Sequence, residues 1–236
     1  MKKTFFILIS VIISSSFAFA QLPFERIRRD KPNLEKIRRE INDRGSKYYY
    51  PTLMKEYLGN DTVMKLDKFR YLYLGFIFQE DYDPYRQSPA PDMNSALYHT
   101  TNPTSGQCDQ IIENAKTALA NNPFDLRQMS AMIAALNLLG EKDLAKIWQY
   151  KLNYLLMAIV STGTGEDENH AWYVIEPQHE YVLLNYMGYQ VTNHIFYDPH
   201  YEFLTVVDVN AGKKGGFYFN LQPLLQEHYR KFPDEL

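Results

Sequence analysis

Residues 141–176 read EKDLAKIWQYKLNYLLMAIVSTGTGEDENHAWYVIE, and the hydrophobic pattern of the chain changes within them. Before Ser161, large apolar side chains such as Leu144 and Trp148 recur every three or four residues, which predicts a helix over 141–159. After Ser161, apolar and polar residues alternate, as is typical of strands. The chain is therefore expected to change from helices to strands near this serine.

The same patterns predict the other elements on both sides of this point. Helices are expected over 33–45, 53–58, 66–79, 106–121 and 124–139, the first with Asn33 as its N-cap. Residues 83–103 contain Pro84, Pro89, Pro91 and Pro103 and are expected to be irregular. Strands are expected at 171–176, 180–185, 191–197, 202–209 and 216–220, and a short helix over 221–232 closes the chain.

Strands that follow helices, rather than alternate with them, favour an α+β fold with segregated layers. The short connections between the strands favour an antiparallel meander. We therefore expect a helical region, 21–160, that packs on an antiparallel β region, 161–236, and the two together form one compact domain. A doubly wound nucleotide-binding sheet is not expected from this order.

The N-terminus has the pattern of a secretory signal peptide. Lys2 and Lys3 precede an apolar run, and small residues end the segment at Ala20. The run is shorter than the roughly 20 residues that span a bilayer, so no transmembrane anchor is expected after cleavage. Residues 1–20 thus predict cleavage after Ala20 and a periplasmic or secreted protein.

The composition excludes some classes of function. The formal net charge is −3, and loss of Lys2 and Lys3 makes the chain more acidic, so binding to nucleic acid through bulk charge is not expected. Cys108 is the single cysteine, so no internal disulfide can form. Stability must therefore come from an apolar core, for which the 15% aromatic content supplies bulky side chains.

Part of the helical region resembles a tetratricopeptide register. Ala118 and Pro123 occupy positions typical of the end of one repeat, and Gly140 followed by Ala145 those of the next inter-helix turn. About one and a half repeats match, and an ordinary helical hairpin is the alternative. The resemblance implies a TPR-like helical pair and a role in protein interaction.

A larger resemblance covers most of the chain. It is carried by the stretches YYP at 49–51, FRYLYLGF at 69–76, QEDYDPY at 79–85, GTG at 163–165, AWYVI at 171–175, EYVLL at 180–184 and YFN at 218–220. These are similar to a secreted bacterial family known only as domain of unknown function 4919. The resemblance implies secretion and the helix-then-sheet layout, and brings no activity, cofactor or catalytic residue.

Two polar segments are candidate ligand sites. The loop after Ser161 contains Glu166, Asp167, Asn169 and His170, which could contact a ligand or simply form a solvated connection. Tyr82 and Tyr85 lie in the irregular segment and could stack on a sugar ring or a peptide, or pack locally in the core. The first hypothesis is a binding or interaction module whose partner is another envelope protein, a peptide or a glycan.

A hydrolase is the alternative hypothesis. It would take its acids and bases from the 163–170 loop and from a 194–202 hairpin that contains His194, Asp198 and His200. The sequence contains no serine-hydrolase elbow, zinc-protease motif or dinucleotide fingerprint. No catalytic residue, metal site or cofactor is therefore predicted, and Cys108 is expected to be a partly buried structural residue.

Overall fold

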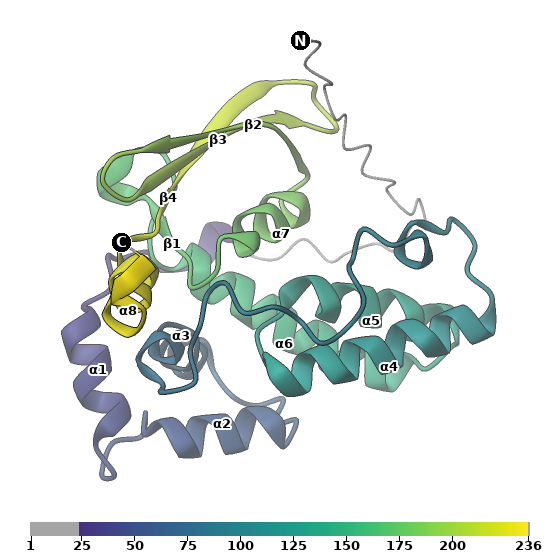
Figure 1. Ribbon diagram of the computed structural model, residues 1–236, viewed down its shortest axis with the longest axis horizontal. Helices are drawn as coiled ribbons and strands as arrows, with labels where there is room; N and C mark the ends of the chain where they lie inside the picture. The colour runs from purple at the N-terminus through teal and green to yellow at the C-terminus, as the bar shows by residue number, and fades with distance from the viewer. Residues whose placement is uncertain (1–23, 236) are drawn as a thin grey trace.

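The computed structural model describes residues 24–235, and the predicted signal peptide lies outside them. Eight α-helices and four strands occur in this part of the chain (Figure 1). The helices are α1 (Leu34–Asn42), α2 (Tyr50–Leu58), α3 (Leu66–Gly75), α4 (Ser105–Asn121), α5 (Leu126–Leu138), α6 (Lys142–Val160), α7 (Gln178–Tyr186) and α8 (Gln222–Lys231). The strands are β1 (Trp172–Tyr173), β2 (Tyr189–Tyr197), β3 (Tyr201–Asp208) and β4 (Lys214–Asn220). Short 3₁₀ turns occupy Phe24–Arg26, Phe76–Phe78, Ala96–His99, Glu168–His170 and Pro233–Glu235. The α+β class and the order of helices before strands are as predicted.

Local capping explains where several helices begin. Asn33 accepts a hydrogen bond from the backbone N–H of Lys36, as its predicted N-cap role requires. Thr104 and Gln107 form a capping box at the start of α4. Gly140 has a φ of +81° after α5, a conformation that glycine adopts without strain, so α6 can turn back along α5. These features fix where α1, α4 and α6 begin.

The sheet is mixed, whereas a purely antiparallel sheet was predicted. Its strand order is β1-β4-β3-β2, in which β2, β3 and β4 are antiparallel and β1 is parallel to β4. The strand expected at 171–176 is only two residues long. The N–H of Tyr173 donates to the Thr162 hydroxyl, and that of Ile175 donates to the Tyr73 hydroxyl, so side chains replace a strand ladder here.

The segment 180–185, predicted to be a strand, is helical and lies within α7. Its short apolar run is compatible with either a strand or a helix. In the helix, the spacing of Glu180, Leu183 and Leu184 places the three side chains on one buried face. All three are buried, and α7 packs against α5 and β2. A helix here covers the inner face of the sheet where a further strand was expected.

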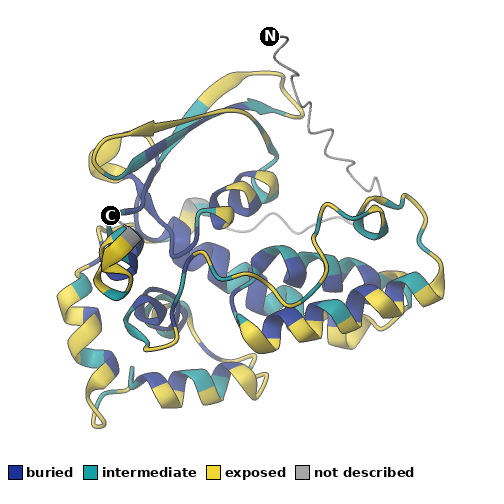
Figure 2. Cartoon of the chain, viewed as in Figure 1, coloured by how far each residue is buried: buried dark blue, intermediate teal, exposed yellow. Residues whose placement is uncertain are grey.

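One apolar core joins the helices to the sheet (Figure 2). It contains Leu72 of α3, Leu155 of α6, Leu183 of α7 and Leu204 of β3, each with no exposed surface. The β2–β3 hairpin is more exposed and curves over α7 (Figures 1 and 2). Among residues 24–235, no helix is both long enough and apolar enough to cross a membrane.

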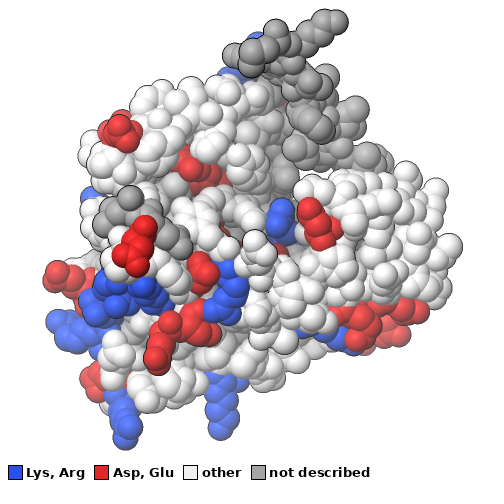
Figure 3. Space-filling model, viewed as in Figure 1, with Lys and Arg blue, Asp and Glu red and all other residues white. Residues whose placement is uncertain are grey.

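Charged side chains of both signs are mixed on the face shown in Figure 3. Lys, Arg, Asp and Glu alternate over the part formed by α1 and α8, and no large area of one sign is visible on that face. This surface lacks the basic stripe by which proteins recognise nucleic acid.

Candidate functional site

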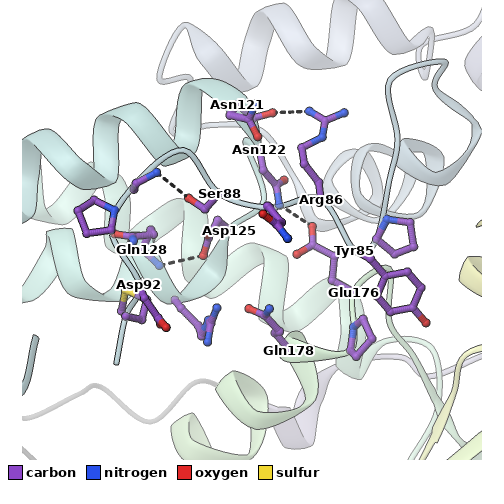
Figure 4. Close-up of a pocket in the computed structure, with 17 residues that line it drawn as sticks. Tyr85, Arg86, Ser88, Asp92, Asn121, Asn122, Asp125, Gln128, Glu176 and Gln178 are labelled. Atoms are coloured by element: carbon purple, nitrogen blue, oxygen red, sulfur yellow. Dashed lines mark hydrogen bonds between the residues drawn. The ribbon is translucent and has the colours of Figure 1, made fainter. Parts of the chain in front are cut away.

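A cavity of about 540 Å³ lies where the irregular segment 84–93 crosses the end of α4, the start of α5 and the residues that precede α7. Figure 4 shows that polar side chains from these three regions point into one space. Its lining includes Tyr85, Arg86, Asp92, Asn122, Asp125, Arg127, Glu176 and Gln178. The segments are far apart in the sequence, so the cavity exists only once the chain has folded.

Glu176 is a buried carboxyl group in this cavity. The side-chain amide of Asn122 donates a 2.7 Å hydrogen bond to Glu176 Oε1. Burial raises the pKa of Glu176 to about 8, an effect that the Asn122 hydrogen bond opposes. The carboxyl group is therefore largely protonated at neutral pH and can donate a hydrogen bond.

His179 lies next to Glu176 and is also buried. Its Nε2 is 2.9 Å from the carbonyl oxygen of Phe124, which can only accept, so Nε2 carries the hydrogen. Its Nδ1 then accepts from the Tyr73 hydroxyl at 2.8 Å. Burial lowers the pKa of His179 to about 3, so the ring is neutral. The 3.6 Å contact between His179 Nε2 and Glu176 Oε2 thus joins two uncharged groups and is not an ion pair.

The walls of the cavity are charged and partly held by backbone contacts. Asp125 caps α5 by accepting from the backbone N–H of Gln128 at 3.0 Å. Arg86 donates to the carbonyl oxygens of Asn121 and Asp81, which ties the irregular segment to the end of α4. Arg127 is different, because its Nε atom is buried and has no hydrogen-bond partner in the described part of the chain. Because Arg127 also lines the cavity, its guanidinium is within reach of a bound group.

The two predicted tyrosines have separate environments. Tyr82 is 1% exposed, and its hydroxyl donates a 2.6 Å hydrogen bond to the carbonyl oxygen of Ile175. Its ring also packs edge-on against Phe76, so Tyr82 is a core residue in this structure. Tyr85 is 51% exposed, lines the cavity and contacts the ring of His228 edge-on. Of the two, only Tyr85 could meet a ligand in the cavity.

The four predicted loop residues, Glu166, Asp167, Asn169 and His170, are exposed and do not line this cavity. Asp167 accepts hydrogen bonds from the ring and the backbone N–H of His170, at 2.8 Å and 2.9 Å, and these bonds to His170 lower the pKa of Asp167. The loop backbone is tied to β4, because Tyr218 N–H donates to the Gly165 carbonyl oxygen. None of the four therefore lines the cavity together with Tyr85.

The histidines of the alternative, hydrolase hypothesis do not line the cavity. His194 Nε2 contacts Glu202 Oε2 at 3.0 Å across the β2–β3 hairpin. His200 lies in the turn that joins β2 to β3, and burial lowers its pKa. The thiol of Cys108 is buried, which raises its pKa and makes it a poor nucleophile. Among the described residues no group of three or more metal-ligating side chains could hold an ion.

Sequence reasoning did not identify Glu176, Asp125, Arg86 or Arg127 as site residues. One signal was present, since Glu176 directly follows the apolar run AWYVI, and a carboxyl group at the end of a buried segment is unusual. The other residues gave no such signal, because distant segments supply the lining.

A known protein family matches most of the chain. Residues 35–230 match the family described as domain of unknown function (DUF4919), which is most of the sequence, so the chain belongs to this family. No curated protein and no solved structure matches the chain.

Proposed function

We propose that this member of the DUF4919 family is an exported binding protein that holds a small polar ligand in the cavity at Glu176. The observation that carries the proposal is the buried Glu176 carboxyl group on the cavity wall, which Asn122 holds and whose pKa burial raises to about 8. Buried groups with strongly shifted pKa values, in a cavity with other polar groups, concentrate at functional sites.

The lining supports recognition of a ligand rich in oxygen acceptors. Protonated Glu176 and the unpartnered Nε of Arg127 are hydrogen-bond donors, whereas Asp92 and Asp125 can accept from ligand hydroxyl or amino groups. The cavity volume of about 540 Å³ lies within the usual range of roughly 300–1,000 Å³ for small-molecule sites. A whole protein partner would need a far larger surface.

The sequence pattern of residues 1–20 supports the export part of the proposal. An exported binding protein would meet peptides, glycans and small metabolites outside the cytoplasm. The TPR-like register of α4–α6 would serve a different function, an interface with another envelope protein, and it stays a prediction.

A cavity-filling variant tests the proposal. Gln178 is exposed at the cavity, so Gln178→Trp places a large ring in it, while Gln110→Trp places the same ring on the exposed face of α4. Native mass spectrometry would follow binding of a panel of amino acids, saccharides, dipeptides and short carboxylates. We expect ligand retention by the wild type and by Gln110→Trp, and binding at least roughly tenfold weaker in Gln178→Trp.

Two results would contradict this function. One is that no compound of the panel binds to the wild type. The other is that Gln178→Trp binds as well as Gln110→Trp, which would place the ligand elsewhere.

A hydrolase that uses the same cavity is the second candidate. The observation that favours it is the pKa of Glu176, since a carboxyl group that stays protonated at neutral pH can act as a general acid. Asp125, whose charge acts on Glu176, would be the accompanying base. A hydrolase that uses the 163–170 loop and the 194–202 hairpin stays a prediction. Turnover of a panel compound that is lost in Glu176→Gln would support an enzyme over a binding protein.

A further inference from the structure

A second, apolar chamber adjoins the polar cavity. It has a volume of about 380 Å³ and lies between α4, α5, α7 and the segment that contains Met93 and Leu97. Its apolar lining includes Leu97, Ile111, Ala131, Ala134, Leu138 and Val182. Small side chains of α5 leave this space open, because an alanine at 131 and at 134 projects only a methyl group into it.

The two chambers share two residues, Met93 and Arg127. Arg127 therefore stands at the boundary between a polar and an apolar space. Its Nε atom is buried without a partner, and within residues 24–235 its side chain makes no hydrogen bond or ion pair. The buried Nε–H has lost its hydration, whereas the half-buried side chain as a whole lines both chambers. An anion bound there would supply acceptors to the guanidinium and compensate its charge.

We propose that the two chambers form one site for a carboxylate joined to an apolar group. The carboxylate binds Arg127 at the boundary, and the apolar group fills the chamber beside Ala131 and Ala134. This inference rests on the proposed function and specifies its ligand class. Charge complementarity favours a single negative charge, because Asp92 and Asp125 in the polar chamber would repel a doubly charged phosphate more strongly.

Such a carboxylate has two sources, a free acyl chain or the last residue of a peptide. Both present the same chemistry to Arg127 and the apolar chamber. Octanoate represents the first source and N-acetylglycylleucine the second. Octanamide has nearly the shape of octanoate without its charge, and propionate has the charge without the tail.

Isothermal titration calorimetry of the purified protein with these four probes tests the inference. We expect octanoate or N-acetylglycylleucine to bind. Octanamide should bind roughly tenfold more weakly, because the charged hydrogen bonds are lost. Propionate should bind more weakly by roughly three- to fourfold for each methylene removed. Whichever of the first two binds more tightly identifies the source. These comparisons change the ligand and do not depend on the folding of a variant.

Paired variants assign the two contacts. Arg127→Gln is expected to weaken octanoate at least roughly tenfold and to leave octanamide unchanged, whereas exposed Arg44→Gln changes neither. Ala134→Leu fills the apolar chamber and should weaken octanoate but not propionate. Ala120→Leu, on the exposed side of α4, is its control.

Binding of only wholly polar compounds, or equal binding of octanoate and octanamide, would overturn this inference and leave the proposed function in place. Binding of octanoate that Arg127→Gln does not change would also overturn it. If neither these probes nor any polar compound binds, both the inference and the proposed function fail.

Discussion

The chain contains two carboxylate–histidine pairs with the same i,i+3 spacing, and burial gives them opposite properties. Asp167 and His170 are exposed, and their contact lowers the pKa of Asp167, which favours the charged form. Glu176 and His179 are buried, so the pKa of Glu176 rises to about 8 and that of His179 falls to about 3. Desolvation, not spacing along the chain, decides which of the two carboxyl groups is ionised.

The comparison also separates what is conspicuous in a sequence from what is chemically unusual in a fold. The pair at 167 and 170 lies in a polar loop that attracts attention, yet its groups face solvent. The pair at 176 and 179 looks ordinary in the sequence and becomes unusual because it is buried against Asn122, Phe124 and Tyr73.

The largest effect is expected from the buried histidine. His179→Ala removes the ring that links the Tyr73 hydroxyl to the Phe124 carbonyl group, and leaves a void beside them. We expect the free energy of unfolding to fall by about 3–5 kcal/mol, measured by urea denaturation. His170→Ala is the matched change in the exposed pair and should leave the urea midpoint at the wild-type value. Equal losses in both variants would break the distinction between the pairs.

The loop that carries the exposed pair depends on its backbone more than on its charges. A Cβ at Gly163 would lie 2.1 Å from the His170 carbonyl oxygen, which also accepts from the N–H groups of Thr164 and Gly165. Gly163→Ala should therefore destabilise the protein by about 3 kcal/mol in the same assay. Gly106→Ala, where a Cβ meets nothing within 4 Å, is the control and should be neutral or stabilising. A neutral Gly163→Ala would refute this close approach.

The pH dependence of stability should show the charge state of the buried pair. The pKa of Glu176 is about 8 in the folded protein against roughly 4.3 when unfolded. Unfolding in this window releases a proton, so stability falls as pH rises from about 4.3 to about 8, by up to about 1.4 kcal/mol per pH unit. Glu176→Gln removes this contribution.

His179 acts in the opposite sense. Its folded pKa of about 3 lies below the unfolded value of roughly 6.5, so it destabilises the protein as pH falls through that range. The difference between wild type and Glu176→Gln cancels the His179 contribution. Parallel stability curves for the two proteins would show that Glu176 ionises normally.

The smallest effect is expected from the exposed carboxylate. Asp167→Asn removes the negative charge but keeps an oxygen that can accept from the His170 backbone N–H. The urea midpoint should not change measurably, because solvent screens the charge of an exposed carboxylate. A shift as large as that of His179→Ala would mean that the loop carries an interaction beyond the contact with His170.

The sequence predicted the helices well because their signals are local. The predicted cap at Asn33 and the helical spacing in α6 depend on residues within one or two turns. Residues 180–185 were predicted wrongly because a short apolar run has no decisive period. The strand at 171–176 was overestimated because Thr162 and Tyr73, remote in sequence, take up its backbone hydrogen bonds.

The site was much harder to predict than the fold. Tyr85 was named from its loop and does line the cavity. Glu176 and Arg127 were missed because their burial, and so their chemistry, comes from contacts between distant segments. Patterns of residue type predict faces and boundaries, whereas a shifted pKa depends on what covers a side chain.

Infrared spectroscopy of the carboxyl groups tests the central claim most directly. The difference spectrum between wild type and Glu176→Gln isolates Glu176, since Glu180, whose pKa burial also raises, is present in both proteins. The account predicts the C=O band of a protonated carboxylic acid at neutral pH, lost with a midpoint near pH 8. A difference spectrum with only the bands of an ionised carboxylate in mildly acidic solution would contradict it.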